Sequence, residues 1–244
     1  MQKVKLYKNK VEIEFDEERH IYRDVKGNNL LSVTGITGVI DKSGALMGWV
    51  AKMMGLYLLQ EAENGNDKIT EELVNTAKRE YRRISKEAAD IGTEIHLWVS
   101  KWIKGQKPEM PENEKVINGI TAFLKFQKAN KIKWLESERI VYSQKYNYCG
   151  ILDAIGKMGK ELVVFDFKSS SGIYPEMLMQ IAGYNIAYTE ETGKNVDGKI
   201  IVQFGKETGE FMVKKLENDG KDEKAFLGAL ALKKRLIEIE RSEN

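Results

Sequence analysis

The sequence predicts an α/β fold, with a central mixed β-sheet flanked by helices and a small N-terminal β element packed against it. Apolar and polar residues alternate from Val4 to Val33, which is typical of antiparallel strands. The run Glu161–Lys168 is apolar and rich in β-branched residues, as a buried central strand requires. Several segments with apolar residues at every third or fourth position supply the flanking helices.

The chain has 244 residues, 42% of them hydrophobic, which fits one substantial α/β core or a core with a small appendage. Only three prolines occur, and no stretch is rich in glycine and serine, so no linker between domains is evident. We therefore expect a single domain over residues 1–244, with residues 1–40 as a small N-terminal β appendage.

Composition excludes several classes of protein. No apolar run is long enough to span a bilayer and the N-terminus lacks a signal-peptide core, so we expect a cytoplasmic protein with no membrane partner. The single cysteine, Cys149, excludes an internal disulfide and an iron–sulfur cluster. The net charge of +2 is too small to attract a polyanion, so contacts with nucleic acid must come from local patches.

The first half of the chain contains three predicted helices after the N-terminal strands. Apolar spacing predicts one helix over Ser43–Glu63, which a polar segment ends. Thr70 is a suitable N-cap for a second helix that runs to Lys104. A third helix is predicted over Asn113–Asn130 and leads into the strands of the sheet.

The second half is predicted to alternate strands and helices. Strands are expected over Trp134–Tyr142, Gly150–Lys157 and Glu161–Lys168. Pro175 stands where a first helical residue should be, and Gly193 ends that helix. A final hairpin over 199–204 and 210–216 and a closing helix over 219–241 complete the chain.

Two carboxylates and an ammonium group are predicted to meet on one patch of this sheet. If Gly159-Lys160 forms a two-residue type II′ turn, Met158 faces Glu161 and Asp153 faces Asp166. Side chains alternate along a strand, so Asp166 and Lys168 point to the same side, while Phe167 points to the other.

Such a patch suits a divalent metal and the hydrolysis of a phosphodiester. Mg²⁺ prefers carboxylate oxygens, retained waters and phosphate oxygens, and Asp153, Asp166 and the carbonyl of Phe167 offer suitable ligands. The Lys168 ammonium would hold or deprotonate the attacking water and offset charge on the phosphorane, if metal charge lowers its pKa. The alternative is a surface hairpin that carries an ordinary ion pair.

Further motifs flank the hairpin in a characteristic order. They are Gly-x-x-x-His at 92–96, Gly-x-x-Asp at 150–153, Asp-x-Lys at 166–168 and Gln-x-x-x-Tyr at 180–184. In this order the chain resembles the PD-(D/E)XK nuclease superfamily, in its RecB-like and phage-exonuclease branch. The segment that starts at Ser32 also looks like the opening segment of phage-encoded members. The resemblance implies a restriction-endonuclease-like core.

The resemblance also implies a role for each matched residue. Asp153 and Asp166 would be the metal carboxylates, Lys168 the catalytic lysine, and His96 a further metal ligand. Gln180 and Tyr184, one helical turn apart, would order the site. A nitrogen ligand makes Mn²⁺ competitive with Mg²⁺, so the cofactor is expected to be one of these two ions. The superfamily's usual proline before the first aspartate is replaced by Leu152.

Several of these residues also have a structural interpretation. A lone histidine such as His96 near an apolar stripe is often a core residue with a satisfied hydrogen bond. Glu94 is a secondary candidate, because an acidic residue on this helix reaches a second metal in related nucleases. Glu136 and Glu138 alternate as an exposed strand face would, so Glu138 is interpreted as an exposed residue outside the site. Gln180 and Tyr184 are also compatible with polar positions on an amphipathic helix.

Local basic patches are the candidates for contact with nucleic acid. One stripe recurs at helical spacing and comprises Lys78, Arg79, Arg82, Arg83 and Lys86. A solvated helix face is the alternative interpretation of this stripe. Ser169 and Ser170 follow the active strand and could donate hydrogen bonds to a phosphate, although a polar turn there needs no function.

These observations predict a metal-dependent deoxyribonuclease, an exonuclease in phage-type DNA recombination, repair or processing. Two alternatives stay open: a structure- or sequence-specific endonuclease, and a vestigial site kept for DNA binding or assembly. The expected partners are DNA and a recombinase or a helicase, since the chain has no nucleotide-binding Gly-Lys-Ser/Thr loop of its own. Related phage exonucleases form ring-shaped oligomers, so a homo-oligomer is a further expectation.

Overall fold

The N-terminal strands pair antiparallel in chain order and then continue into the main sheet. A computed structural model describes residues 1–66 and 68–243. Strands β1 (Gln2–Leu6), β2 (Val11–Asp16), β3 (Ile21–Arg23) and β4 (Asn29–Ser32) form consecutive antiparallel pairs. β4 then pairs in parallel with β6 (Tyr148–Met158). The predicted N-terminal β element is therefore hydrogen-bonded to the sheet as well as packed on it.

The main sheet contains β5 (Lys133–Ser143), β6, β7 (Glu161–Lys168), β8 (Gly198–Phe204) and β9 (Phe211–Leu216). The strand order is β1-β2-β3-β4-β6-β7-β8-β9, and β5 pairs with β6. β7 and β8 are parallel, whereas β5–β6, β6–β7 and β8–β9 are antiparallel. The predicted mixed sheet and α/β class are confirmed.

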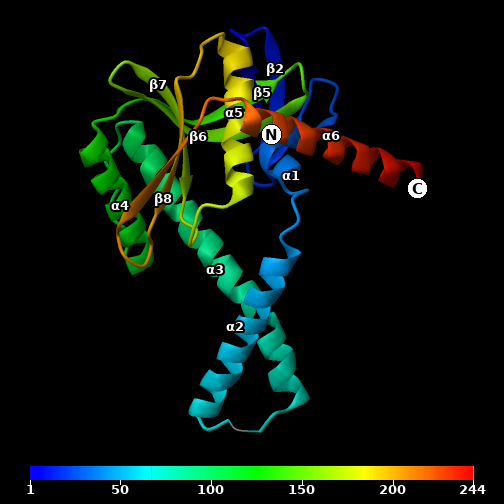
Figure 1. Cartoon of the computed structure of the whole chain (residues 1–244), viewed down its shortest axis with the longest axis vertical. Coiled ribbons are helices and arrows are strands. Elements are labelled where there is room, and N and C mark those ends of the chain that lie inside the picture. Colours follow the sequence, from blue (N-terminus) through cyan, green and yellow to red (C-terminus); the bar gives the residue numbers. More distant parts are fainter. Residues whose placement is uncertain (67, 244) are drawn as a thin grey trace. The chain divides into compact units, whose positions relative to one another are not determined.

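Helices cover both faces of this sheet (Figure 1). Helix α4 (Glu114–Asn130) lies on one face, where Phe123 and Phe126 contact rings of β7, among them Phe165 and Phe167. Helix α5 (Pro175–Thr192) lies on the other face, with α1 (Val33–Thr37) and α6 (Lys221–Ser242) packed beside it. The apolar core is thus divided by the sheet into an aromatic layer under α4 and a largely aliphatic layer under α5.

The structure divides into two compact units. The sheet unit comprises Met1–Ile40 and the chain from Ile95 onward, and the helical unit is Asp41–Glu94. The helical unit contains α2 (Ser43–Glu63) and most of α3 (Glu71–Ile103), whose last turns belong to the sheet unit. The single-domain assignment over 1–244 stays a prediction.

Helix boundaries agree with the predicted capping residues. Thr70 Oγ1 accepts a hydrogen bond from the Leu73 amide at 3.1 Å, and Gly193 ends α5 with a left-handed φ of +68°. Within the helical unit, α2 has no buried residue, and its Trp49 ring lies 6.3 Å from that of Tyr81. None of the described helices has both the length and the apolar character needed to cross a bilayer.

Candidate functional site

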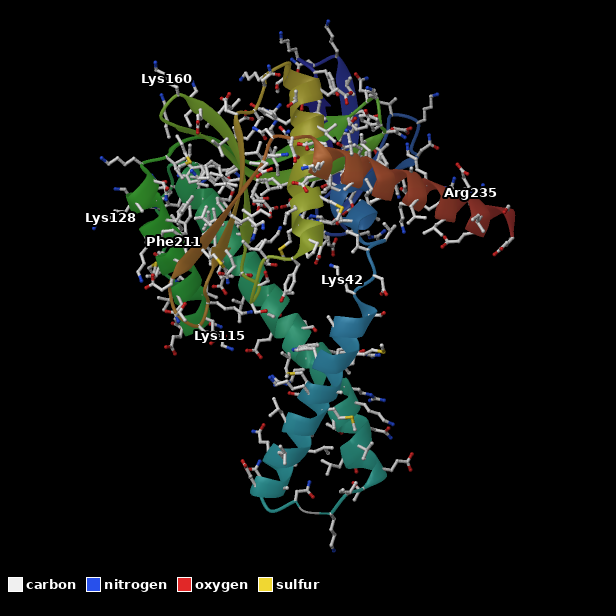
Figure 2. The ribbon with its side chains drawn as sticks, viewed as in Figure 1. Lys42, Lys115, Lys128, Lys160, Phe211 and Arg235 are labelled. Atoms are coloured by element: carbon white, nitrogen blue, oxygen red, sulfur yellow. The ribbon has the colours of Figure 1, made fainter. Side chains whose placement is uncertain are left out.

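The β6–β7 hairpin has the predicted register. Gly159 has a φ of +61°, as the first position of a type II′ turn requires, and Met158 faces Glu161. The ladder continues to Ala154 opposite Phe165, so Asp153 and Asp166 come next along their strands. Figure 2 shows Lys160 at the exposed tip of this hairpin.

Asp153 lies where one edge of β6 changes partner. β5 occupies the other edge of β6 from Tyr148 to Lys157. On the edge of β6 opposite β5, β4 pairs with Tyr148 and Cys149, and β7 pairs with β6 from Ala154 onward. Among the described residues, Gly150–Asp153 have no strand partner on this edge. The sheet therefore forks, and Asp153 stands at the fork.

The Asp153 carboxylate is held by hydrogen bonding and by charge. Its Oδ2 accepts a hydrogen bond of 2.6 Å from the amide of Phe167, which fixes the position of the carboxylate across the fork. Its Oδ1 lies 3.5 Å from Nδ1 of His96. Burial opposes ionisation, but His96, Lys168 and the Phe167 amide together lower the pKa of Asp153, so the carboxylate is charged.

His96 lies in the last turns of α3 and contributes a nitrogen to the fork. Burial acts to lower the pKa of His96, but the adjacent Asp153 carboxylate outweighs it and raises the pKa. Its ring is 6.3 Å from that of Phe167, so the imidazole is bounded on one side by the aromatic layer. The histidine is half-buried and faces a carboxylate, which suits a metal ligand better than a core residue.

Glu138 has the exposed position on β5 that was predicted, but its carboxylate lies in the candidate site, where it was not expected. Ligand atoms of His96, Glu138 and Asp153 all lie within 4.8 Å of one another. Burial, followed by the charge of Asp153, raises the pKa of Glu138 to about 7. Alternation predicts the exposure correctly but not the direction of the carboxylate, because β5 is irregular here: Glu138 has a left-handed φ of +53°, and the β5–β6 register shifts after Trp134.

Asp166 and Lys168 form a buried ion pair beside this cluster. Nζ of Lys168 lies 2.7 Å from Oδ2 of Asp166, whose side chain is 1% exposed. Burial and then Asp153 raise the pKa of Asp166 to about 6, although Lys168 opposes the shift. Burial acts to lower the pKa of Lys168, but Asp166 and Asp153 outweigh it and raise the pKa, so the ammonium keeps its proton.

Gln180 and Tyr184 of α5 are hydrogen-bonded to each other, and Tyr184 contacts the end of the fork at Gly150. Nε2 of Gln180 donates to the Tyr184 hydroxyl at 2.9 Å. Burial, followed by Asp166 and Asp153, raises the pKa of Tyr184 far above its usual range. The Tyr184 ring packs on Gly150, where an added Cβ would lie 2.5 Å from Cε1. The glycine of the Gly-x-x-Asp motif therefore makes room for the tyrosine.

Gly150→Ala is expected to lower the free energy of unfolding by about 1–3 kcal/mol, because the new methyl group overlaps the Tyr184 ring and lies 3.0 Å from Cγ2 of Val33. Chemical denaturation measures the change. Gly228→Ala is the matched control, since this exposed residue inside α6 has open space around it and should gain about 0.4–1 kcal/mol. Equal stability of Gly150→Ala and the wild type would contradict the close packing.

The remaining predicted residues have different surroundings. Phe167 packs its ring under α4 with 2% exposure, and the ligand role of its carbonyl stays a prediction. Ser169 and Ser170 line a pocket that begins beyond Lys168. Glu94 is exposed on α3 and belongs to the helical unit, so its role as a second-metal ligand stays a prediction.

The basic stripe is an exposed helix surface of the helical unit in which several cations already have partners. Arg83 pairs with Glu80 at 2.5 Å, and Lys86 pairs with Asp90 at 2.6 Å. Arg82 Nε donates to the Tyr81 hydroxyl at 3.1 Å. Exposed pairs of this kind exchange readily with phosphate, so the DNA-binding role of Arg79, Arg82, Arg83 and Lys86 stays a prediction.

The donor set at the fork fits a divalent cation. Both carboxylate oxygens of Asp166 are buried; Oδ2 faces the Lys168 ammonium, and Oδ1 has no hydrogen-bond donor among the described residues. Buried carboxylate oxygens without donors are costly, and a metal ion is one way of satisfying them. The cluster offers one imidazole nitrogen with carboxylates from Glu138 and Asp153, and Asp166 interacts electrostatically with Asp153 and His96. Mn²⁺ or Mg²⁺ accepts such a mixed set.

Without metal, the protein is expected to lose stability as pH rises from about 5 to 8, with a fall of roughly 5 °C in midpoint temperature. Glu138 and Asp166 have folded pKa values of about 7 and 6, above their ordinary values. Their contribution is present at acidic pH and is lost as pH rises through these values. The raised pKa of His96 acts in the same direction.

Thermal unfolding followed by near-ultraviolet circular dichroism in EDTA measures the midpoint temperature at each pH. Addition of Mn²⁺ should raise this temperature more at pH 8 than at pH 5.5. Glu138→Gln should flatten the slope, whereas Glu161→Gln, an exposed residue of the same sheet, should leave it unchanged. A slope of the opposite sign would show that the carboxylates are not held in the uncharged form by burial.

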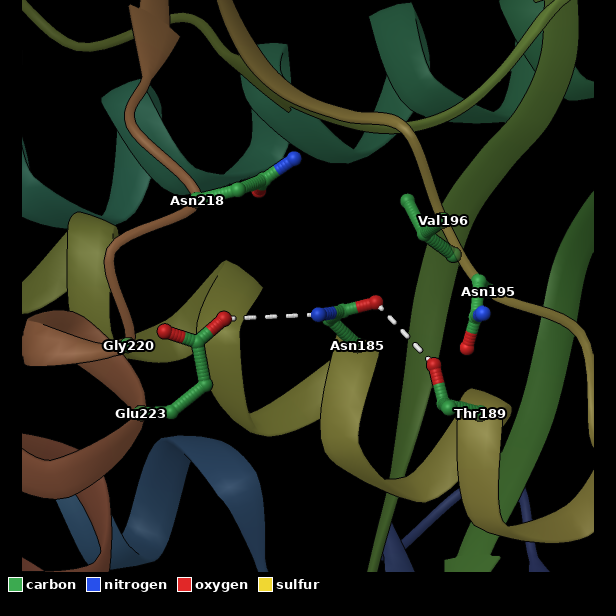
Figure 3. A pocket seen from close by; sticks show the side chains of 7 residues that line it. All are labelled: Asn185, Thr189, Asn195, Val196, Asn218, Gly220 and Glu223. Atoms are coloured by element: carbon green, nitrogen blue, oxygen red, sulfur yellow. Dashed lines mark hydrogen bonds between the residues drawn. The ribbon is translucent and has the colours of Figure 1, made fainter.

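A second pocket, of about 260 Å³, lies between α5 and the start of α6 (Figure 3). Its polar lining is held by Asn185, which donates to Glu223 at 3.3 Å and is 3.4 Å from the hydroxyl of Thr189. Glu223 also pairs with Lys199, a lysine of β8 with no exposed surface. No residue of the fork lines this pocket, and its charged lining residue, Glu223, balances the charge of the buried Lys199.

Comparison with known proteins gives distant likenesses only. No protein-family model matches the chain, and no curated protein matches it. The alkaline exonuclease LHK-Exo from Laribacter hongkongensis is similar in its complex with dAMP, at 11% identity and a TM-score of 0.45 over 86% of this chain and 89% of that one. A second LHK-Exo structure gives 11% identity and 0.39, over 88% and 94%. The structure of SSO0001 gives 14% identity and 0.35, over 75% and 85%.

Proposed function

We propose that the protein is a metal-dependent nuclease that hydrolyses DNA phosphodiester bonds. The observation that carries the proposal is the convergence at one fork of a histidine and two carboxylates, within 4.8 Å of one another, beside the buried Asp166–Lys168 pair. Perturbed pKa values of several adjacent groups are typical of functional sites.

Asp153, Asp166, His96 and Glu138 would hold Mg²⁺ or Mn²⁺. When bound, the metal lowers the pKa of an attacking water and offsets the charge of the scissile phosphate, so no covalent enzyme intermediate is needed. Asp153 is prepared for this role, because the Phe167 amide holds its Oδ2 and leaves Oδ1 directed to the His96 side.

Lys168 would act mainly through its charge. Asp166 and Asp153 keep its ammonium protonated, so it can donate hydrogen bonds to a phosphate oxygen and stabilise the extra negative charge of the pentacovalent state. Removal of a proton from water by this lysine would require the two carboxylates to be engaged elsewhere, as they are when they bind a metal.

Gln180 and Tyr184 would orient the site without taking part in proton transfer. The phenol keeps its proton because burial and the nearby carboxylates raise its pKa. Its ring fills the space over Gly150 and supports the segment of β6 that leads to Asp153, which pairs with β5 but has no strand partner among the described residues on its other edge.

The experiment that tests the proposal is cleavage of end-labelled linear and covalently closed circular DNA with Mn²⁺ or Mg²⁺. We propose exonuclease action, as in phage-type recombination, repair or processing, for which linear DNA is degraded and circles survive. Cleavage of closed circles would favour the endonuclease alternative. Equal activity of the wild type, Asp166→Ala and Lys168→Ala would contradict a nuclease. Absence of Mn²⁺ binding in calorimetry would favour a vestigial site.

A further inference from the structure

A pocket of about 400 Å³ lies at the carboxyl ends of the parallel strands β7 and β8. Its walls are the turn Ser169–Ser171 after β7, Gln203 near the end of β8, and the β8–β9 connection with the start of β9. Ligands of open α/β sheets bind outside the carboxyl ends of the strands, and this volume is within the range of small-molecule sites.

The pocket begins next to the candidate catalytic lysine. Ser169 follows Lys168 in the chain, and Gln203 is the register partner of Lys168 in the β7–β8 ladder. Register partners in parallel strands share a face of the sheet, so Gln203 lies on the Lys168 side. A chain of nucleotides with one phosphate at Lys168 would therefore place a neighbouring nucleotide at this pocket.

Gln203 is a polar side chain buried in the pocket wall and only partly satisfied. It is 9% exposed, and its Nε2 donates a hydrogen bond of 2.7 Å to the Ser170 carbonyl oxygen. That bond fixes the orientation of the Gln203 side-chain amide, because the Ser170 carbonyl oxygen can only accept and the amide must therefore turn its NH₂ group towards it. Its Oε1 accepts no hydrogen bond from the described residues and is not among the fully buried atoms, so it is open to the pocket. An exocyclic amino group of a nucleobase is a donor that suits this oxygen.

The charges of the pocket favour one phosphate. The half-buried Lys206 has no ion-pair partner among the described residues. The two acidic residues of the wall are neutralised from α4, since Glu207 pairs with Lys115 at 3.6 Å and Glu210 pairs with Lys125. The hydroxyls of Ser170 and Ser171 already have partners, whereas the Lys206 ammonium and the Ser169 hydroxyl line the same pocket and are available to a phosphate oxygen.

The third wall is apolar. Phe211, labelled in Figure 2, is half-buried on β9, and Met212 is 50% exposed. Aromatic and thioether side chains offer a nucleobase a flat, polarizable contact. The pocket thus combines a phosphate contact, a hydrogen-bond acceptor and an apolar surface within the dimensions of one nucleotide.

We propose that this pocket binds the nucleotide adjacent to the scissile phosphate and favours bases that carry an amino group. Lys206 and Ser169 contact the phosphate, Gln203 Oε1 accepts from adenine, cytosine or guanine, and Phe211 and Met212 contact the base. Thymine has no amino group and binds more weakly. The proposal rests on the proposed nuclease function and adds a base preference to it.

Saturation-transfer NMR with the full-length protein in EDTA tests the pocket without hydrolysis. The probes are dAMP, dTMP and inorganic phosphate. We expect dAMP to bind more tightly than dTMP. Lys206→Ala should weaken the affinity for dAMP about tenfold or more, and Gln203→Met should abolish the difference in affinity between dAMP and dTMP. Lys214→Ala, an exposed residue of β9 outside the pocket, should leave dAMP binding unchanged.

Two outcomes overturn the inference: no binding of dAMP, or binding that both Lys206→Ala and Gln203→Met leave unchanged. The second would place the nucleotide elsewhere, for example at Lys168. Lys206 lies outside the strands, in the β8–β9 connection, so Lys206→Ala serves as the test if Gln203→Met does not fold. If dAMP binds as expected but no DNA is cleaved, the result supports the proposed nucleotide pocket and contradicts the proposed nuclease function. A protein that cleaves DNA without binding dAMP contradicts the pocket alone.

Discussion

Asp166→Asn is expected to lower the rate of DNA hydrolysis by about 10³-fold or more while leaving the metal-free protein folded. The substitution removes the carboxylate of a proposed metal ligand but keeps the size of the side chain. It also removes a buried carboxylate whose pKa is raised to about 6, so the metal-free variant should be at least as stable as the wild type at pH 8. Single-turnover cleavage with Mn²⁺ and thermal unfolding in EDTA measure the two effects.

Asp222→Asn is the matched control for this prediction, since Asp222 lies in the first turn of α6, away from the fork. It should leave cleavage unchanged. A parallel loss of activity and of stability in Asp166→Asn would indicate that Asp166 supports the fold, and cleavage at the wild-type rate would remove it from the active site.

Lys168→Met is expected to lower the rate by about 10²- to 10³-fold, with Mn²⁺ binding retained. The methionine keeps the apolar stem of the lysine but removes the positive charge that lies 2.7 Å from Asp166. Without this charge, the pKa of Asp166 should rise further, because burial and Asp153 both act in that direction. The metal-free variant should therefore be less stable than the wild type at pH 8 and similar to it at pH 5.

Titration calorimetry with Mn²⁺ separates the role of Lys168 in rate from a role in metal binding. Lys160→Met is the control, because Lys160 is an exposed lysine of the same hairpin. If Lys168→Met bound Mn²⁺ normally and also cleaved DNA at the wild-type rate, the proposed stabilisation of phosphate charge by this ammonium would be wrong.

Local signals in the sequence were sufficient for most elements of the fold. Gly159 at the first position of a two-residue turn fixes the β6–β7 register, and with it the side of the sheet on which each residue lies. Thr70 and Gly193 fix helix ends through a side-chain cap and a left-handed residue. Each of these signals acts within a few residues of the chain and can be read directly.

Contacts between distant segments could not be predicted in the same way. Glu138 is exposed, as a regular alternation predicts, but its left-handed backbone and the shifted β5–β6 register bring its carboxylate close to Asp153, which alternation does not predict. A left-handed φ in a glutamate is strained, and only the surrounding structure can impose it. The parallel pairing of β4 with β6 likewise depends on the whole fold, and so does the packing of Tyr184 on Gly150.

The parallel pairing of β4 with β6 has a consequence for the time at which the site forms during synthesis. Leu31 pairs with Tyr148, more than a hundred residues further along the chain, and the whole helical unit Asp41–Glu94 lies between them in sequence. Closing so long a loop makes this pairing slow relative to the local hairpins. The fork also needs β7 and the Tyr184 ring of α5, which the ribosome releases later still. The nascent chain is therefore expected to lack the assembled fork until β7 and α5 have both emerged, so the side chains of the candidate site come together late in synthesis.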